Sequence, residues 1–361
     1  MLSVLLIPLS SHSGDYFYIT AGLNSGIMKI TFFDSLPHEE VFFTVHLPHE
    51  IEAVFVNTSL HPAANIPENT LDSEAISVFT PSLLNAKTLD KFPNLKFILL
   101  RSVGFSHVDM HYAHERGIHV FNCPNYGDYT VAEYVFASLL ALIRQIVQSN
   151  NALRMGNILL DKYVGVELFG KTMGVIGTGA IGSKVVKIAK GFSMDVIAYD
   201  VVKTTDVTYV SLDELCTQAD IISINTPLTA DTLRMFDRNR INSLKKGVII
   251  VNTARGEIID TDALYDAIVD KRVAYAALDV IECEDILWQK PARAQGFNNV
   301  KDTCLKNFLI ANRLLKMDNV LITPHTAYDT KEATKRILEI TLQNISSCIN
   351  FDPGAKNQVL V

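Results

Sequence analysis

Residues 172–182 read TMGVIGTGAIG. A short apolar run suited to a buried strand leads directly into the pattern G-x-G-x-x-G, and helix-forming residues follow it. The next strand-like run, VIAYD, ends in Asp200 at about the spacing expected of a dinucleotide-binding strand–helix–strand unit. The sequence therefore predicts a nucleotide-binding α/β domain built around this segment.

Each part of the glycine motif has a chemical reason. Gly177 permits the tight turn, Gly179 lets backbone amides approach a pyrophosphate, and Gly182 lets the helix and strand pack closely. The helix N-terminus adds partial positive charge for the phosphates. Asp200 can accept hydrogen bonds from ribose hydroxyls and would repel a 2′-phosphate, which favours NAD over NADP. A glycine-rich turn without a ligand is the alternative, and the full context disfavours it.

Most strand-like runs in the chain are continuously apolar, which indicates parallel strands buried on both faces. They alternate with helix-like stretches in two series, so we predict an α/β fold with two doubly wound parallel-sheet domains. The first series lies at 29–34, 53–57, 75–79, 96–100 and 119–121, and the second at 172–177, 195–200, 220–225, 247–252, 275–280 and 319–323.

Two helix starts are marked by capping-box spacing. Thr130 and Glu133 would open a long helix over 130–149, and Ser211 and Glu214 would open a shorter one. The apolar face of helix 130–149 is a candidate dimer surface, although it could simply be buried within its own domain.

The domain boundaries follow from the loop NCPNYGDY, at residues 122–129, and from a C-terminal helix over 330–349 with an apolar stripe. If that helix returns to the first domain, the first domain is discontinuous and a cleft separates the two. We therefore expect a first domain of residues 28–128 and 326–361, and a second of residues 129–325.

Residues 1–27 have no place in the strand–helix alternation. The opening MLSVLLIPLS faintly resembles the apolar part of a signal peptide, but no basic residue precedes it and no small-x-small cleavage pattern follows. We expect these residues to form an extension outside the fold.

Composition excludes several function classes. The chain has 361 residues, a formal net charge of −7 and no long basic run, which disfavours nucleic acid or an anionic membrane as partner. Its longest apolar stretch, 134–143, is too short to span a bilayer. The 5 cysteines form no C-x-x-C pair and are odd in number, which argues against a disulfide framework or a cysteine-based zinc site and favours a reducing, cytoplasmic compartment. Histidines such as His107 and His111 show no ligand spacing, so no metal is expected.

Polar residues follow three apolar strands of the second series, where parallel strands place their ligands. Arg255 follows one strand, Glu282 and Glu284 follow another, and His325 follows the last. An arginine can grip a carboxylate and polarise the adjacent carbonyl, a histidine can donate a proton, and a carboxylate behind the histidine fixes its tautomer. Taken singly, Arg255 could instead be a surface ion-pair partner, Glu284 a solvated acid and His325 a helix cap.

The chain resembles the D-isomer-specific 2-hydroxyacid dehydrogenase family, and within it the fermentative D-lactate dehydrogenase branch. The resemblance covers about Met28 to the C-terminus, except for a poorly matched segment at 288–304. It is carried by RSVGFSHVD (101–109), NYGDYTVAEY (125–134), GKTMGVIGTGAIG (170–182), ADIISINTPLT (219–229), IIVNTARGEIID (249–260), AALDVIECED (276–285) and NVLITPHTAYDT (319–330).

The resemblance implies a flavodoxin-like substrate domain, a Rossmann NAD-binding domain and an active site between them. It implies Arg255, Glu284 and His325 as the catalytic set, and the family's spacing selects Glu284 over Glu282. The implied activity is reversible hydride transfer between NADH and a small 2-keto acid, with pyruvate and D-lactate as the leading pair. A bulkier 2-keto acid, or a dinucleotide-sensing binding protein of the same fold, are the alternatives. The family also implies a homodimer.

The remaining site residues are expected in two groups. The cofactor is expected to contact Gly177, Gly179, Ala180, Ile181, Gly182, Asp200, Thr226, Pro227, Thr253, Ala254 and Asp279. The substrate carboxylate is expected at the backbone amides of Val103 and Gly104, and its side chain near Phe105, Tyr126 and Tyr328, although these aromatics could equally be ordinary packing.

Overall fold

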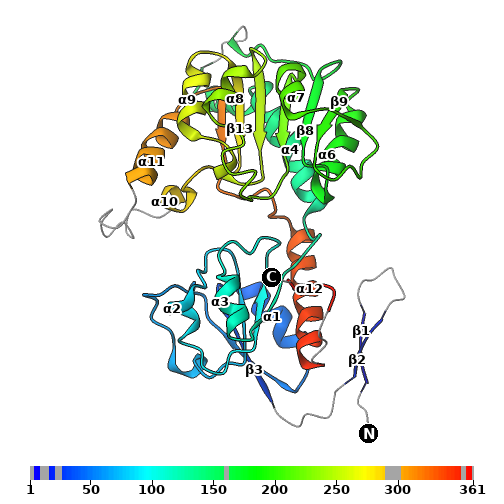
Figure 1. The fold of residues 1–361 in the computed structure, drawn as a ribbon, viewed down its shortest axis with the longest axis vertical. Coiled ribbons are helices and arrows are strands. Elements are labelled where there is room, and N and C mark those ends of the chain that lie inside the picture. The colour runs from blue at the N-terminus through cyan, green and yellow to red at the C-terminus, as the bar shows by residue number, and fades with distance from the viewer. Residues whose placement is uncertain are drawn as a thin grey trace. The chain divides into compact units, whose positions relative to one another are not determined.

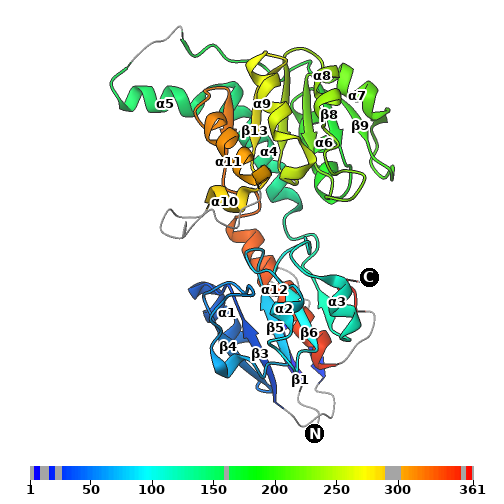
Figure 2. The same ribbon diagram turned by 60° about the vertical axis from the view of Figure 1, so that its left-hand side comes forward.

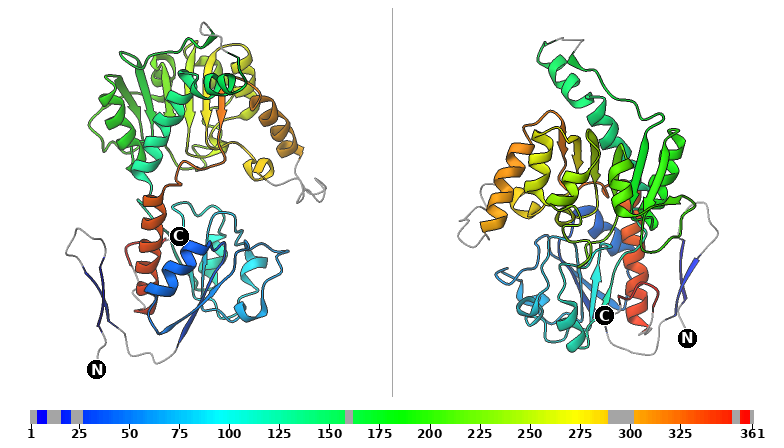
Figure 3. Two further views of the ribbon diagram at one scale, coloured as in Figure 1. Left: turned by 180° about the vertical axis from the view of Figure 1, so that it is seen from behind. Right: turned by 45° about the horizontal axis from the view of Figure 1, so that its top comes forward.

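The computed structural model describes residues 4–8, 16–20, 27–157, 162–288, 302–350 and 355–359. The chain divides into two compact units, one made of residues 1–126 with 330–361 and the other of residues 127–329 (Figure 1). Each unit contains a parallel sheet with helices on both of its faces (Figures 2 and 3). The predicted α/β class with two parallel sheets is therefore confirmed.

The first unit is built on a five-stranded parallel sheet in the order β4-β3-β5-β6-β7. One face packs against α1 and α12 through side chains such as Phe43 and Ile345, and the other packs against α2 and α3. The elements are β3 (Met28–Phe32), α1 (Pro37–His46), β4 (Ile51–Phe55), η1 (Glu68–Thr70), β5 (Ala75–Val78), α2 (Ala86–Leu89), β6 (Phe97–Leu100), α3 (Met110–Glu115), β7 (His119–Phe121) and α12 (Lys331–Ile349).

The second unit is built on a seven-stranded parallel sheet in the order β10-β9-β8-β11-β12-β13-β14. Helices α4 and α6 cover one face, while α7, α8, α9 and α11 cover the other. The elements are α4 (Asp128–Ile143), α5 (Ile146–Arg154), β8 (Thr172–Ile176), α6 (Ala180–Gly191), β9 (Asp195–Tyr199), β10 (Thr208–Tyr209), α7 (Leu212–Gln218), β11 (Ile221–Ile224), α8 (Arg238–Ser243), β12 (Val248–Asn252), η3 (Gly256–Ile258), α9 (Thr261–Val269), β13 (Val273–Leu278), α10 (Glu284–Trp288), α11 (Asp302–Leu314) and β14 (Val320–Ile322).

The strand order of the second unit reverses beside β8. The chain runs outward from β8 through β9 to β10, and then returns to place β11 on the other side of β8. Ligands of open α/β sheets bind at such a reversal, outside the carboxyl ends of the strands. The glycine motif at 177–182 directly follows β8 and therefore lies at this point.

The helix predicted over 130–149 differs from the structure in two ways. It consists of α4 and α5, which are separated where Gln145 takes a left-handed φ of 51°. Its first helix begins at Asp128 with Gly127 as N-cap, so the capping box predicted at Thr130 is wrong. The box predicted at Ser211 is confirmed, since its hydroxyl accepts from the backbone of Glu214 at 3.2 Å.

The cysteines also depart from expectation. Cys283 and Cys304 form a disulfide with their Cα atoms 5.5 Å apart, whereas Cys123, Cys216 and Cys348 are buried free thiols. The expectation of a chain without disulfides is therefore wrong in this place. The two residues are separated by 21 positions and meet only because α10 and α11 fold against each other, which no local cysteine pattern reveals.

The N-terminal residues form a small sheet of their own. Strands β1 (Val4–Pro8) and β2 (Tyr16–Thr20) pair antiparallel, and within the described ranges neither joins the five-stranded sheet. The assignment of residues 1–27 to an extension remains a prediction. Most of the poorly matched segment 288–304 lies outside the described residues.

Taken one at a time, no helix in the described ranges is long and apolar enough to cross a membrane. Only when taken together are α4 and α5 long and apolar enough for a membrane span, and the two helices are bent by 55° at their join.

Candidate active site

Three adjacent strands of the second unit end at the same level. In the register of the parallel sheet, Asn252 of β12 lies opposite Leu278 of β13, which in turn lies opposite Ile322 of β14. Arg255, Glu284 and His325 therefore leave the same edge of the sheet within a few residues of the strand ends. This edge is where doubly wound sheets place their ligands.

His325 and Glu284 are in direct contact. Nδ1 of His325 lies 2.6 Å from Oε1 of Glu284, and the two side chains are 33% and 25% exposed. The second oxygen of Glu284 accepts a hydrogen bond from the backbone of Ile281 at 3.2 Å, which fixes the carboxylate. A carboxylate on Nδ1 orients the ring and leaves Nε2 as the nitrogen that can exchange a proton with a bound molecule.

The backbone at His325 is left-handed, with a φ of 53°, a conformation that non-glycine residues adopt at a cost on the order of 1–3 kcal/mol. The buried side chain of Asp279 holds it there. The carboxylate of Asp279 accepts from the hydroxyl of Thr323 at 2.6 Å and from the backbones of Thr326 at 3.0 Å and Ala327 at 2.8 Å. Asp279, which the sequence assigned to the cofactor, therefore positions the histidine turn.

Glu282, the other acid considered at this turn, is committed elsewhere. It is 7% exposed, and its carboxylate accepts hydrogen bonds from Arg234 at 3.3 Å, the backbone of Thr261 at 3.0 Å and Asn307 at 3.1 Å. It is Glu284, not Glu282, that contacts His325.

Arg255 is presented by a tight turn that the side chain of Asn252 holds together. Asn252 accepts from the backbone of Ala254 at 3.0 Å and donates to the carbonyl of Arg255 at 2.9 Å. The next residue must be glycine, because a Cβ on Gly256 would lie 2.1 Å from the carbonyl carbon of Ile281. The turn that carries Arg255 is thus packed against the turn that leads to Glu284.

The glycine motif forms an open helix N-terminus. Gly177 has a φ of 82°, and a Cβ on Gly182 would lie 1.8 Å from the carbonyl oxygen of Gly177, so both positions require glycine. A Cβ on Gly179 would meet nothing within 4 Å. Gly179 is also the N-cap of α6 and supplies no capping side chain, so the first amides of α6 can receive a phosphate. The residues at this turn fit a dinucleotide.

Asp200 lies beside this turn. Its carboxylate accepts from the backbone and hydroxyl of Thr178 at 2.6 and 3.1 Å, and from the backbone of Val202 at 3.0 Å. Burial opposes ionisation of Asp200, but these hydrogen bonds together outweigh it and lower its pKa. Asp200 is therefore negatively charged at neutral pH, as the predicted preference for NAD over NADP requires.

Two further cofactor candidates follow neighbouring strands. Thr253 comes directly after β12, and in the described part of the chain its buried hydroxyl finds no hydrogen-bond partner. Thr226 and Pro227 follow β11, with Thr226 half-buried and Pro227 exposed. An unpartnered buried hydroxyl at the ligand edge of the sheet fits a residue that binds a polar group of a bound molecule.

The first unit holds the substrate candidates on the loop after β6. Val103 and Phe105 are 48% and 41% exposed, which is compatible with contact to a ligand. The loop is fixed from inside, since the hydroxyl of Ser102 donates to the carbonyl of Gly104 at 2.7 Å. Tyr126 of the same unit is buried, while Tyr328 belongs to the second unit and is half-buried.

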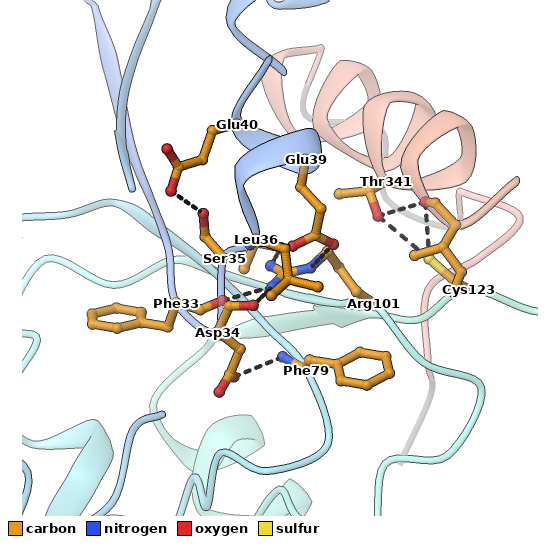
Figure 4. A network of polar contacts seen from close by, with 12 residues as sticks. Phe33, Asp34, Ser35, Leu36, Glu39, Glu40, Phe79, Arg101, Cys123 and Thr341 are labelled. Atoms are coloured by element: carbon orange, nitrogen blue, oxygen red, sulfur yellow. Dashed lines mark hydrogen bonds and ion pairs between the residues drawn. The ribbon is translucent and has the colours of Figure 1, made fainter. Parts of the chain in front are cut away.

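Arg101, at the start of this loop, was missed by the sequence reasoning. It is 1% exposed and joins three elements (Figure 4), with hydrogen bonds to Ser77 at 2.9 Å and to the carbonyl of Phe33 at 2.6 Å, and an ion pair with Glu39 at 3.3 Å. A charged residue directly after the apolar run KFILL was the signal that could have identified it.

Comparisons with known proteins give one consistent result. A family model described as "D-isomer specific 2-hydroxyacid dehydrogenase, NAD binding domain" matches residues 136–327. The chain is 36% identical over 292 residues to the aromatic 2-oxoacid reductase of Clostridium sporogenes, covering 79% of this chain and 85% of that protein. It is 34% identical over 338 residues to a 2-hydroxyacid dehydrogenase homologue of Schizosaccharomyces pombe, covering 91% and 98%. The solved D-lactate dehydrogenase of Aquifex aeolicus, complexed with NAD and lactic acid, aligns with a TM-score of 0.81 at 35% identity, covering 92% and 99%.

The Arg101 network predicts a large stability effect. Arg101→Leu should lower the free energy of unfolding by about 3–5 kcal/mol, because it leaves the buried carboxylate of Glu39 without its partner. Lys96→Met is the matched control, since Lys96 is 57% exposed and its pair with Glu74 should be worth less than about 1 kcal/mol. Urea unfolding measures both. Equal losses of unfolding free energy in the two variants would show that the buried Arg101–Glu39 pair stabilises the fold no more than an exposed pair does.

Proposed function

The chain belongs to the D-isomer specific 2-hydroxyacid dehydrogenase family, and from that premise we propose that it reduces a small 2-keto acid with NADH, reversibly, with pyruvate and D-lactate as the pair. The observation that carries the proposal is the 2.6 Å contact between His325 and Glu284, on the same sheet edge as Arg255. A proton donor with an oriented ring and a guanidinium are the two groups that keto-acid reduction requires from a protein.

In the proposed reaction, Arg255 binds the substrate carboxylate in a two-pronged contact and polarises the adjacent carbonyl. The hydride for C2 would come from NADH when the cofactor is bound. His325 donates the proton on Nε2 to the forming alkoxide, and Glu284 stabilises the imidazolium through Nδ1. The products are the 2-hydroxy acid and NAD⁺, and the reverse reaction begins with neutral His325 as the base.

For the cofactor, we propose that the first amides of α6, at Ala180 and Ile181, bind the pyrophosphate and that Asp200 binds the adenosine ribose. Thr226 and Pro227 would lie by the adenosine side, and the hydroxyl of Thr253 would face the nicotinamide side, together with Ala254. The open space in front of Gly179 and the unpartnered hydroxyl of Thr253 support this arrangement. Asp279 would not contact the cofactor directly but would hold the turn that carries His325.

For the substrate, we propose that the backbone amides at Val103 and Gly104, on the loop after β6, bind its carboxylate. Phe105, Tyr126 and Tyr328 are the candidates for contact with the side chain of the substrate. The likeness to a D-lactate dehydrogenase structure supports a small substrate, while the likeness to an aromatic 2-oxoacid reductase supports the bulkier alternative. A panel of 2-keto acids assayed with NADH decides between them. If no keto acid of the panel is reduced, the proposed enzymatic activity is contradicted and a dinucleotide-sensing protein is favoured.

The quaternary proposal is a homodimer formed through α5. The surface first considered, the apolar face of α4, is the wrong one, because Val135 and Leu139 are fully buried within their own unit. In α5 and the residue that follows it, Ile146, Leu153 and Met155 are 55%, 61% and 73% exposed. A second copy of the chain would cover them. A cytoplasmic location likewise remains a proposal.

We expect Leu153→Lys to shift the protein from dimer to monomer, because a lysine at the centre of an apolar interface must be desolvated. Sedimentation equilibrium measures the change, with Leu309→Lys on α11 as the control, since Leu309 is 57% exposed on another helix. A wild-type protein that sediments as a monomer would contradict the proposal.

The Asp200 assignment predicts cofactor choice. The wild-type enzyme should have a higher kcat/KM with NADH than with NADPH, and Asp200→Ala should narrow that ratio because the repulsion of a 2′-phosphate is lost. Asp213→Asn is the control, as its side chain is 84% exposed on α7. Equal efficiencies in the wild type would refute the argument from Asp200.

The Glu284–His325 pair predicts a loss of turnover. Glu284→Gln removes the negative charge that stabilises the imidazolium in the proposed reaction, so kcat for keto-acid reduction should fall. Oxidation of the hydroxy acid uses neutral His325 as its base, so its kcat should fall less. His325→Gln should lower turnover by roughly 10²–10⁴-fold.

The kcat values of keto-acid reduction and of hydroxy-acid oxidation are the measurement, and Glu282→Gln is the matched control. Glu282 lies two residues from Glu284 but bonds to Arg234, Thr261 and Asn307, so its replacement should leave the ratio of the two kcat values unchanged. A ratio that stays fixed in Glu284→Gln and changes in Glu282→Gln would reverse the two assignments.

A further inference from the structure

The Cys283–Cys304 disulfide lies directly beside the proposed catalytic pair. Cys283 immediately precedes Glu284, the first residue of α10, and takes a left-handed φ of 58°. Cys304 lies in the first turn of α11. The disulfide thus ties the residue before the carboxylate partner of His325 to a second helix.

Helix α11 is anchored independently of the disulfide. Its Lys306 pairs with Asp262 of α9 at 2.9 Å, whereas its Asn307 donates at 3.1 Å to Glu282 on the tied turn itself. Ile310 and Leu314 of α11 belong to the buried core of the second unit. Cys304 is therefore a fixed point, and the disulfide joins the turn that carries Glu284 to it.

The cysteines of the chain fall into two chemical classes. Cys123, Cys216 and Cys348 are buried, and burial raises the pKa of Cys123 to about 12 and that of Cys216 to about 11, so these thiols are unreactive. Cys283 and Cys304 are only half-buried, so an external thiol can reach their bond. Disulfides in reducing compartments are usually transient and redox-sensing.

We propose that Cys283 and Cys304 are a reversible thiol–disulfide modification site that controls the proposed hydride transfer by holding or releasing Glu284. Its effect on turnover rests on the function proposed above. With the bond formed, Glu284 is held against His325. With the bond broken, the turn before α10 loses its covalent link to α11. The carboxylate of Glu284 then contacts Nδ1 of His325 in a smaller fraction of the molecules.

The exchange involves a dithiol as reductant. One thiolate of the dithiol attacks a sulfur of the Cys283–Cys304 bond and forms a mixed disulfide, which the second thiolate then resolves. Two electrons and two protons pass to the protein, which gains two thiols, and the dithiol leaves as its own disulfide. An oxidised dithiol reverses the reaction.

The test is a redox titration of the full-length protein with mixtures of reduced and oxidised dithiothreitol. Alkylation under denaturing conditions, read by mass spectrometry, should count the 3 free cysteines before reduction and all 5 after it. Reduction should lower kcat by roughly 2- to 30-fold. It should leave KM for the keto acid nearly unchanged, because Arg255 lies on a separate turn. The kcat and thiol curves should share one midpoint.

The double variant Cys283→Ser/Cys304→Ser should have the kcat of the reduced wild type, and this kcat should not change with dithiothreitol. In Cys216→Ser, kcat should change with dithiothreitol as it does in the wild type. Five alkylated cysteines in protein equilibrated with oxidised dithiothreitol would overturn the proposal, and so would a kcat that stays constant while the thiols titrate.

Hydrogen exchange keeps the test independent of turnover. Reduction should accelerate amide exchange in the peptide spanning 281–288 in the wild type and leave the double variant unchanged. Unchanged exchange in the wild type would overturn the proposal. A protein that shows the exchange response without turning over any keto acid would refute the proposed function and retain the thiol site.

Discussion

The close approach of two backbones, at Gly256 and Ile281, is the constraint on which the rest of the site depends. A Cβ at Gly256 would lie 2.1 Å from the carbonyl carbon of Ile281, so only glycine lets the turns after β12 and β13 pack together. Arg255 is presented by the first of these turns and Glu284 by the second. Since β12, β13 and β14 are paired in register, the third turn delivers His325 to the same edge.

Three acids close together in the sequence take three roles, which their surroundings set. Asp279 is buried, and its carboxylate accepts hydrogen bonds from the turn around His325. Glu282 is nearly as buried and accepts hydrogen bonds from Arg234, from the backbone of Thr261 in α9 and from the side chain of Asn307 in α11. Glu284 is 25% exposed and meets the histidine ring. Only the last has both a proton-exchanging neighbour and access from outside, which is why the proposed chemistry is assigned to it.

The sequence predicted the features that local physical chemistry determines. Apolar runs located the strands of both parallel sheets except the short edge strand β10, which has only two residues. The glycine motif located the open N-terminus of α6, and the box at Ser211 marked α7. It missed features that depend on contacts between distant residues. The break at Gln145, the hub at Arg101 and the Cys283–Cys304 bond leave no periodic signal in their own neighbourhoods. The cofactor and substrate contacts stay predictions because they depend on molecules outside the chain.

The proposed chemistry depends on the hydrogen bond between Nδ1 of His325 and Glu284, which nitrogen NMR of the histidine rings can detect. With ¹⁵N-labelled protein, the His325 signals are identified by their loss in His325→Gln. Their long-range couplings then show which ring nitrogen carries the proton when the ring is neutral. This hydrogen bond predicts a proton on Nδ1, with a chemical shift that changes in Glu284→Gln and not in Glu282→Gln. A neutral ring protonated on Nε2, unaffected by Glu284→Gln, would contradict it.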